Sequence, residues 1–184
     1  NPKKRIIDII SEPLKNFENL TETENKKKIL ELLEIVGLSE DALYKYPHEF
    51  SGGQRQRIGI ARAVATKPQL IIADEPISAL DLSVQAQVLN YMKDIQKQYN
   101  LSYLFISHDL GVVKHMCDYI YILNSGRFVE TGTKIDIYDF PKHPYTKRLI
   151  AAIPEIHPEK RMENAIKRKK IEEEYQKNKK RYFG

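Results

Sequence analysis

Apolar residues in the first fifty positions of the chain follow a helical spacing. Over Thr21–Val36 they recur every three or four positions, which predicts an amphipathic helix that ends at Gly37. A short helix is expected to start at Ile6 and to end at Pro13, because proline lacks the backbone N–H that a helix interior uses. A further short helix is predicted over Glu40–Tyr44.

From Phe50 onward, helical spacing alternates with short apolar runs. Helices are predicted over residues 51–66 and Leu82–Tyr99, and strands over Leu70–Asp74 and Tyr103–Ser107. Strand, helix and strand in this order form a βαβ unit with parallel strands. Because both runs are almost wholly apolar, we expect strands that are buried on both faces of the sheet.

The pattern then changes to a hairpin and ends in helices. A helix is predicted over Asp109–Met116, followed by strands over Tyr119–Leu123 and Arg127–Thr131 that are joined by a turn at residues 124–126. A short helix over Tyr145–Ala152 comes next. The predicted fold class is therefore α/β.

The length and composition indicate how many domains the chain forms and which compartment suits it. A chain of 184 residues with 41% hydrophobic residues suits one domain, or one domain with an appendage. Its apolar runs are far shorter than the roughly 20 residues of a membrane helix, and its first residues lack the apolar segment of a signal peptide. Cys117 is the single cysteine, which excludes an internal disulfide, suits a reducing cytoplasm and predicts a small core residue.

The net charge of +5 lies largely in the last third of the chain. The segment Lys160–Arg181 is rich in Lys and Arg with interspersed Glu, and we expect a partly helical, solvated tail. A surface that attracts nucleic acid or anionic lipid is the alternative. No nucleic-acid partner is expected.

Ser51-Gly52-Gly53-Gln54 opens the helix predicted over residues 51–66. The N–H groups of a first helical turn and the helix dipole favour an anion there. The two glycines would let a ligand approach the backbone, and the Ser51 hydroxyl adds a donor. The segment is a candidate phosphate cradle, with an ordinary helix cap as the alternative.

Two adjacent carboxylates end the first predicted strand. Asp74 can hold Mg²⁺ through water, and Glu75 can orient and deprotonate a water that attacks a phosphate. Open α/β sheets bind their ligands at the carboxyl edge of the strands. An ordinary polar turn therefore explains these two residues less well.

Asp81 and His108 are two further candidates. Asp81 precedes the second helix of the βαβ unit, and capping that helix would be its ordinary role. His108 follows the second strand, so we expect it to share the carboxyl edge with Asp74 and Glu75. An imidazole there can bind a phosphate oxygen or the attacking water, whereas a structural histidine is the alternative.

The order of these motifs resembles that of the ABC ATPase cassette. Phe50-Ser51-Gly52-Gly53-Gln54 resembles the signature motif and Leu70–Glu75 resembles Walker B with its catalytic glutamate; Ser78-Ala79-Leu80-Asp81 resembles the D-loop, and His108 the switch histidine. The resemblance covers roughly residues 1–158. It implies the C-terminal part of a P-loop NTPase cassette, with a parallel sheet core, a helical signature subdomain and a C-terminal extension.

The same resemblance implies ligands and roles. ATP and Mg²⁺ are the expected cofactors, with Asp74 holding the metal through water and with Glu75 and His108 as catalytic residues. The signature segment, Ser51 to Gln54, and the D-loop residue Asp81 would act across a dimer, on ATP bound to the partner cassette. The implied domains are residues 1–50 (part of the helical subdomain), 51–140 (ATPase core), 141–158 (extension) and 159–184 (charged tail).

A narrower resemblance is to the ATPases of oligopeptide and dipeptide importers. It is carried by Asn1-Pro2 and Ile9–Leu14 near the start and by His143–Lys147 with Ala151–Pro154 near the end. It implies a peripheral protein on the cytoplasmic face of the membrane. Its partners would be a second ABC ATPase, as a homo- or heterodimer, two transmembrane permease subunits and, indirectly, an extracellular solute-binding protein.

The sequence contains no G-x-x-x-x-G-K-[ST] phosphate-binding loop. The Q-loop glutamine and the adenine-stacking aromatic residue would also lie upstream of Asn1. We therefore interpret the chain as an N-terminally truncated cassette and expect it to be inactive alone. Two other functions stay open: a soluble, non-transport ABC ATPase, and import of another solute such as nickel.

Overall fold

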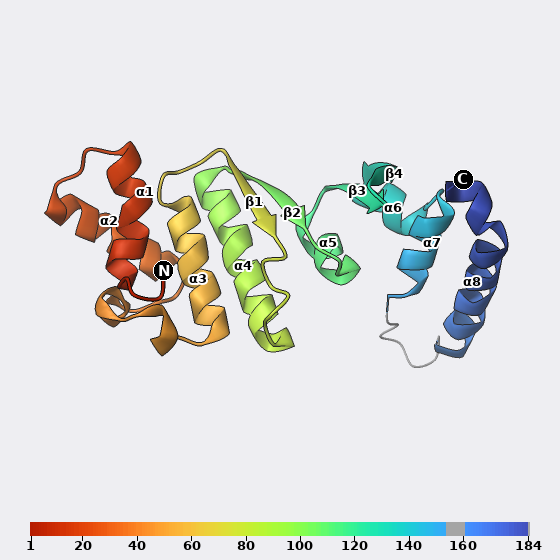
Figure 1. Cartoon of the computed structure of the whole chain (residues 1–184), viewed down its shortest axis with the longest axis horizontal. Helices are drawn as coiled ribbons and strands as arrows, with labels where there is room; N and C mark the ends of the chain where they lie inside the picture. The colour runs from red at the N-terminus through yellow and green to blue at the C-terminus, as the bar shows by residue number, and fades with distance from the viewer. Residues whose placement is uncertain (154–160, 184) are drawn as a thin grey trace. The chain divides into compact units, whose positions relative to one another are not determined.

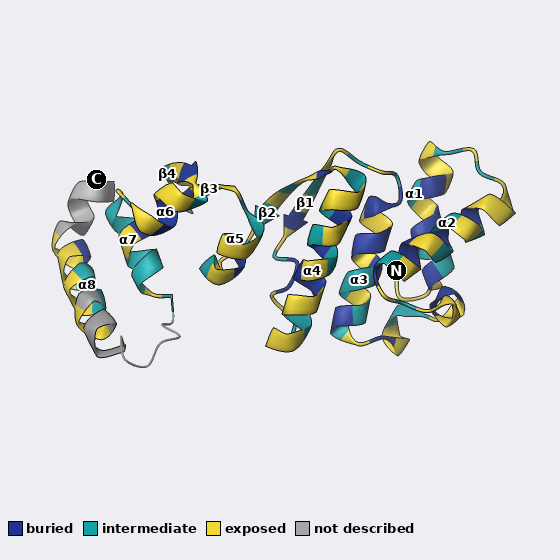
Figure 2. Cartoon of the chain, turned by 180° about the vertical axis from the view of Figure 1, so that it is seen from behind, coloured by how far each residue is buried: buried dark blue, intermediate teal, exposed yellow. Residues whose placement is uncertain are grey.

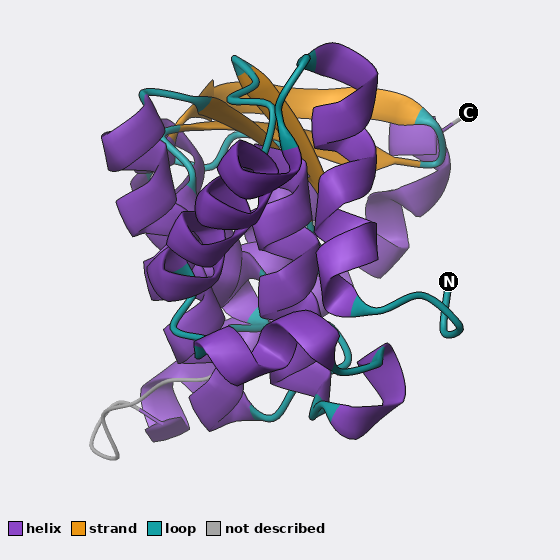
Figure 3. Cartoon of the chain, turned by 90° about the vertical axis from the view of Figure 1, so that its left-hand side faces the viewer, coloured by secondary structure: helices purple, strands orange, loops and turns teal. Residues whose placement is uncertain are grey.

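The computed structural model describes residues 1–153 and 161–183 and divides the chain into two compact units, Asn1–Ile106 and Ser107–Gly184. Helices form most of both units, and the strands are short (Figure 3). The division into four domains stays a prediction.

The first unit contains four α-helices, two short 3-10 helices and two strands. In chain order these are α1 (Ile6–Phe17), α2 (Glu22–Ile35), η1 (Glu40–Tyr44), η2 (Pro47–Glu49), α3 (Gly52–Val64), β1 (Leu70–Asp74), α4 (Leu82–Tyr99) and β2 (Ser102–Ile106). Helix α1 packs against α2 and α3, and α3 packs against α4 (Figure 1). Buried and exposed positions alternate around these helices (Figure 2), as amphipathic spacing requires.

Helix α1 corrects the prediction that Pro13 ends the first helix. The helix continues through Pro13 to Phe17, although proline offers no N–H to the preceding turn. Ile6, Ile10 and Leu14 recur every four residues and are all fully buried. Burial of this continuous apolar stripe outweighs the loss of one backbone hydrogen bond.

Helix α2 confirms the predicted amphipathic helix. The Thr21 hydroxyl accepts the Glu24 N–H and the Glu24 carboxylate accepts the Thr21 N–H, which forms a capping box. Gly37 ends the helix with a φ of 65°, a conformation that favours glycine. The Arg57 guanidinium, from α3, donates to the Gly37 carbonyl at 3.2 Å and so ties the end of α2 to α3.

Strands β1 and β2 pair in parallel and are joined by α4, which confirms the βαβ unit. The expectation that both faces are buried is wrong. The exposed face carries large apolar side chains that are 46–64% exposed: Leu70, Ile72, Leu104 and Ile106. Within the described residues this sheet has two strands, and residues of α3 and α4 lie near Ile71, Ala73 and Tyr103.

Among its described residues, the second unit contains an antiparallel hairpin and four helices. Its elements are α5 (Leu110–Met116), β3 (Tyr119–Asn124), β4 (Arg127–Thr133), α6 (Lys134–Asp139), α7 (Pro144–Ala151) and α8 (Arg161–Phe183). The predicted turn is confirmed, because Ser125 and Gly126 both have positive φ (49° and 77°), as tight hairpins require. Helix α6 was not anticipated, although Thr133 and Asp136 form a capping box that marks its start.

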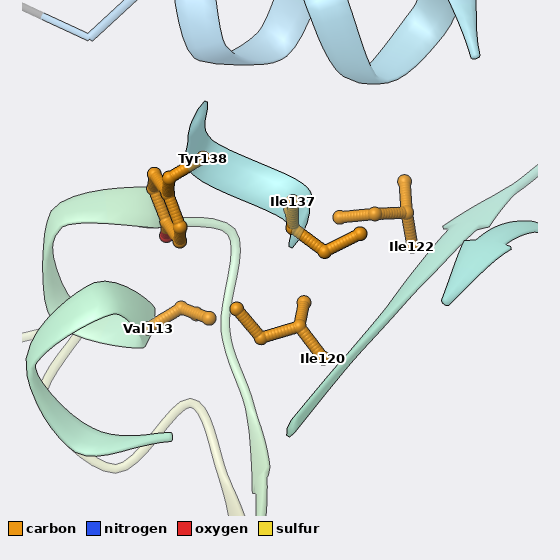
Figure 4. Close-up of a cluster of buried hydrophobic side chains, with 5 residues drawn as sticks. All are labelled: Val113, Ile120, Ile122, Ile137 and Tyr138. Carbon is orange, nitrogen blue, oxygen red and sulfur yellow. The ribbon is translucent and has the colours of Figure 1, made fainter. Parts of the chain in front are cut away.

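Five buried side chains form the core of the second unit: Val113, Ile120, Ile122, Ile137 and Tyr138. They come from α5, β3 and α6 and point toward one another (Figure 4). Cys117 packs against this cluster, and burial raises the pKa of its thiol. Its predicted role as a small core residue is confirmed.

Glu130 of β4 anchors the start of α7. Its two carboxylate oxygens accept the N–H groups of Lys142 (2.7 Å) and His143 (2.9 Å), while His143 Nδ1 accepts the Tyr145 N–H. Burial acts to raise the pKa of Glu130. The Thr146 hydroxyl and the two N–H groups outweigh burial and hold that pKa below its usual value.

The predicted helical tail is confirmed, and most of its described side chains are exposed. It forms α8, which packs against α7 and buries Tyr175 to 4% exposure. The Arg148 guanidinium lies 4.8 Å from the Tyr175 ring, and Arg148 Nε pairs with Glu172 at 2.6 Å. Pro154 and the predicted boundary at residues 158–159 lie outside the described residues.

Candidate functional site

Asp74 and Glu75 occupy the carboxyl end of β1, as predicted. Asp74 is exposed and pairs in register with Ile106, the last residue of β2. Glu75 follows with a φ of 47°, and its N–H donates to the Ile106 carbonyl at 2.9 Å. A left-handed backbone is costly for a residue with a side chain, so local strain coincides with the predicted catalytic carboxylate.

Two consecutive turns lead from Glu75 to α4. The Glu75 carbonyl accepts hydrogen bonds from the N–H and the hydroxyl of Ser78, at 3.3 and 3.2 Å, and the Leu80 N–H donates to the Ile77 carbonyl. Asp81 then occupies the cap position of α4 through its backbone, because its carbonyl accepts the N–H groups of the first turn. These turns set the spacing between Glu75 and Asp81.

Gln85 is a residue of this site that the sequence did not reveal. Its Nε2 donates to the carbonyl of Leu80 at 2.9 Å and to that of Ile77 at 3.3 Å, so one amide bridges the second turn. A glutamine in the first turns of a helix has no distinctive local pattern. Its importance depends on how the preceding loop folds back over it.

The start of α3 is a capping box, which confirms the ordinary interpretation of Ser51. The Ser51 hydroxyl oxygen accepts the Gln54 N–H at 3.3 Å, and the Gln54 side chain accepts the Ser51 N–H at 2.9 Å. The Ser51 O–H keeps its hydrogen as a donor. Its use as a phosphate cradle stays a prediction.

The structure gives the two glycines of this segment a packing role. A Cβ on Gly53 would lie 2.2 Å from Val84 of α4, and a Cβ on Gly52 would lie 3.4 Å from the Leu80 side chain. The glycines therefore let the start of α3 approach the loop before α4 closely. The structure brings together two motifs, at residues 51–54 and 78–81, that the sequence placed only in order.

Asp74 is better suited to a hydrated magnesium ion than to a metal site made entirely of protein ligands. Mg²⁺ keeps several waters and binds through one or two carboxylates together with substrate phosphates. Across residues 1–153 and 161–183 no group of three or more His, Cys, Asp or Glu gathers to hold a metal. An exposed carboxylate at a strand end fits an ion shared with a nucleotide.

His108 is exposed and belongs to the second unit, two residues beyond the end of β2. Its predicted position beside Asp74 and Glu75 therefore stays a prediction. Among the described residues, no helix has both the length and the apolar character to cross a membrane.

Comparisons with known proteins agree with this arrangement. The ABC transporter family matches residues 4–78, and the C-terminal region of oligopeptide/dipeptide transporters matches residues 129–184. The oligopeptide transport ATP-binding protein OppF of Lactococcus lactis is 58% identical over 183 residues, which cover all of this chain and 57% of that protein. The chain belongs to the ABC transporter ATP-binding family. The second match continues through α8, so the resemblance extends beyond the predicted limit at residue 158.

A second relative in the ABC family is similarly close in sequence. The dipeptide transport ATP-binding protein DppF of Escherichia coli is 49% identical over 163 residues, or 89% of this chain and 49% of that protein. The chain spans about half the length of the curated relatives it matches.

Two solved structures share the fold, each with a TM-score of 0.65 and with 73% of this chain covered. One is a metal-chelate type ABC transporter in an inward-facing conformation; it is 29% identical to this chain, and the match covers 54% of its own chain. The other is a dimeric ATP-binding cassette in a post-hydrolysis state, bound to ADP and Pi. It is 27% identical to this chain, and the match covers 58% of its own chain. The predicted cassette fold is thus confirmed.

Proposed function

We propose that the protein containing this chain is the ATP-binding subunit of an importer, which couples ATP hydrolysis to the uptake of oligopeptides or dipeptides. One observation carries the proposal. A strand-end pair of carboxylates, Asp74 and Glu75, lies in the same unit as a signature-like helix start that packs on the loop before α4. The match of residues 129–184 to a peptide-transporter region supports this function over a soluble ABC ATPase.

Asp74, Glu75 and His108 would each have a different role in ATP hydrolysis. Asp74 would hold Mg²⁺ through water, and the ion would neutralise charge on the ATP phosphates. Glu75, whose backbone is left-handed, would orient and deprotonate the attacking water. His108 would bind a γ-phosphate oxygen or the same water.

The signature segment would act on a neighbouring subunit. Ser51 to Gln54, with Asp81, would contact ATP held by a second ABC ATPase, because the N–H groups and the Ser51 hydroxyl suit a phosphate. Two transmembrane permease subunits and an extracellular solute-binding protein complete the proposed system. The subunit would lie at the cytoplasmic face of the membrane as a peripheral protein.

The test uses the full-length protein assembled with its partner subunits. In Glu75→Gln, Mg²⁺-dependent ATP hydrolysis should fall about 1,000-fold, because general-base catalysis contributes that order of rate, while ATP binding is retained and peptide uptake into vesicles stops. Asp94→Asn, an exposed carboxylate on α4, is the matched control and should hydrolyse ATP normally. Loss of ATP binding in Glu75→Gln, or unchanged hydrolysis, would contradict the assigned role.

A further inference from the structure

The loop between Glu75 and Asp81 is buried at Pro76 and Ile77, whereas its second half, residues 78–80, is exposed or half-buried. Its backbone makes only short-range turn bonds, from Ser78 to Glu75 and from Leu80 to Ile77, at 3.1–3.3 Å within the described residues. Isolated turns of this kind are individually weak in water. Yet the loop separates two residues with assigned roles, so its conformation sets their relative position.

The Gln85 side chain is the contact from outside the loop that spans its second turn. It comes from α4, and its Nε2 bonds the carbonyls of Ile77 and Leu80, two residues beyond Glu75 and one before Asp81. The Leu80 side chain in turn lies against Gly52. The Gln85 amide therefore ties the second turn of the loop to α4, and Leu80, whose carbonyl it bonds, also lies against the start of α3.

We infer that Gln85 is a positioning residue for ATP hydrolysis, which holds the Glu75–Asp81 loop so that the carboxylate of Glu75 and the residues acting across the dimer keep a fixed geometry. The inference rests on the proposed function. A primary amide suits this task because a single nitrogen carries two N–H donors, one for each carbonyl. A glutamate of the same shape would point oxygens at both carbonyls.

Gln85→Glu and Gln87→Glu form a matched pair for the test. Gln87 lies two residues further along the same helix, is exposed, and receives the same change of charge. In the full-length protein assembled with its partners, Gln85→Glu should lower kcat about tenfold and leave the KM for ATP within about twofold, because it disturbs the reacting geometry more than ATP binding. Gln87→Glu should match the wild type in both constants.

Two further measurements separate positioning from simple loss of stability. Gln85→Met keeps the length of the side chain without donors and should show the same fall in kcat at an unchanged Tm. Amide hydrogen exchange at residues 77–81 should accelerate in Gln85→Met and Gln85→Glu but not in Gln87→Glu. An active wild type with equal kcat in all variants would overturn the inference alone, whereas a wild type without ATPase activity would overturn the proposed function as well.

Discussion

The two units of the chain hold their functional segments in different ways. In the first, motif residues make local contacts, such as Ser51 with Gln54, and the longer contacts of Glu75 with Ile106 and of Gly53 with Val84 bring the motifs together. In the second, the peptide-transporter region is held by longer connections, from Glu130 to His143 and from Arg148 to Glu172. Local motifs therefore identify the candidate residues of the first unit, whereas the contacts described for the second unit join residues that carry no such motif.

The largest expected effect concerns the packing of α8 in the second unit. Tyr175→Ala removes a ring that is 4% exposed and lies against Tyr145 and Arg148. Replacing a buried aromatic residue with alanine should destabilise the α7–α8 packing by about 3 kcal/mol. Hydrogen exchange should become fast throughout α8 while α1–α4 stay protected. Lys177→Ala on the exposed side is the control, and equal protection in both variants would show that α8 does not depend on this contact.

A smaller effect is expected at the close approach within the first unit. Gly53→Ala would place a Cβ 2.2 Å from Val84 and should destabilise the unit by about 2 kcal/mol, because overpacking displaces neighbouring atoms. On the same helix, a Cβ at Gly59 would meet open space among the described residues, so Gly59→Ala should be neutral or stabilising by up to about 1 kcal/mol. Urea unfolding compares the two, and equal stabilities would remove the packing role assigned to Gly53.

The smallest effect tests the anchor of the second unit through its pH dependence. The pKa of Glu130 is held below its usual 4.5 in the folded chain, so its contribution is present above that pH and is lost as the pH falls through the folded pKa. Glu130→Gln should cost about 1 kcal/mol at pH 7 and flatten the dependence of Tm on pH below about 4.5. Asp139→Asn, also in the second unit but exposed, should keep the wild-type dependence. If Tm fell more steeply with acid in Glu130→Gln than in the wild type, the lowered pKa of Glu130 would be contradicted.

Most secondary structure was readable because it depends on local spacing. The βαβ order and the hairpin turn are each specified by neighbouring residues, and each is confirmed. The errors occur where a longer-range contact decides the outcome. Burial of the α1 stripe carries the helix through Pro13, and Tyr175 of the predicted helical tail is buried although the sequence did not single it out.

The candidate site was predicted in part for the same reason. Asp74 and Glu75 are recognisable because a strand-end position is itself a local signal. Gln85 was missed because its two acceptors are backbone carbonyls, which carry no residue identity and converge only after the loop folds. Glu130 was missed because its partners lie 12 and 13 residues away.

By itself, the sequence determined the order of the motifs, the parallel pairing of β1 and β2 and the family of the chain, because these depend on residue types at short spacings. Only the tertiary structure decided that the starts of α3 and α4 meet at Gly52 and Gly53, and that Gln85 bridges the loop between Glu75 and Asp81. The physical reason is how far apart in sequence the interacting residues lie. Hydrogen-bonded turns and helix periods are encoded locally, whereas close packing depends on which surfaces meet after the chain has folded.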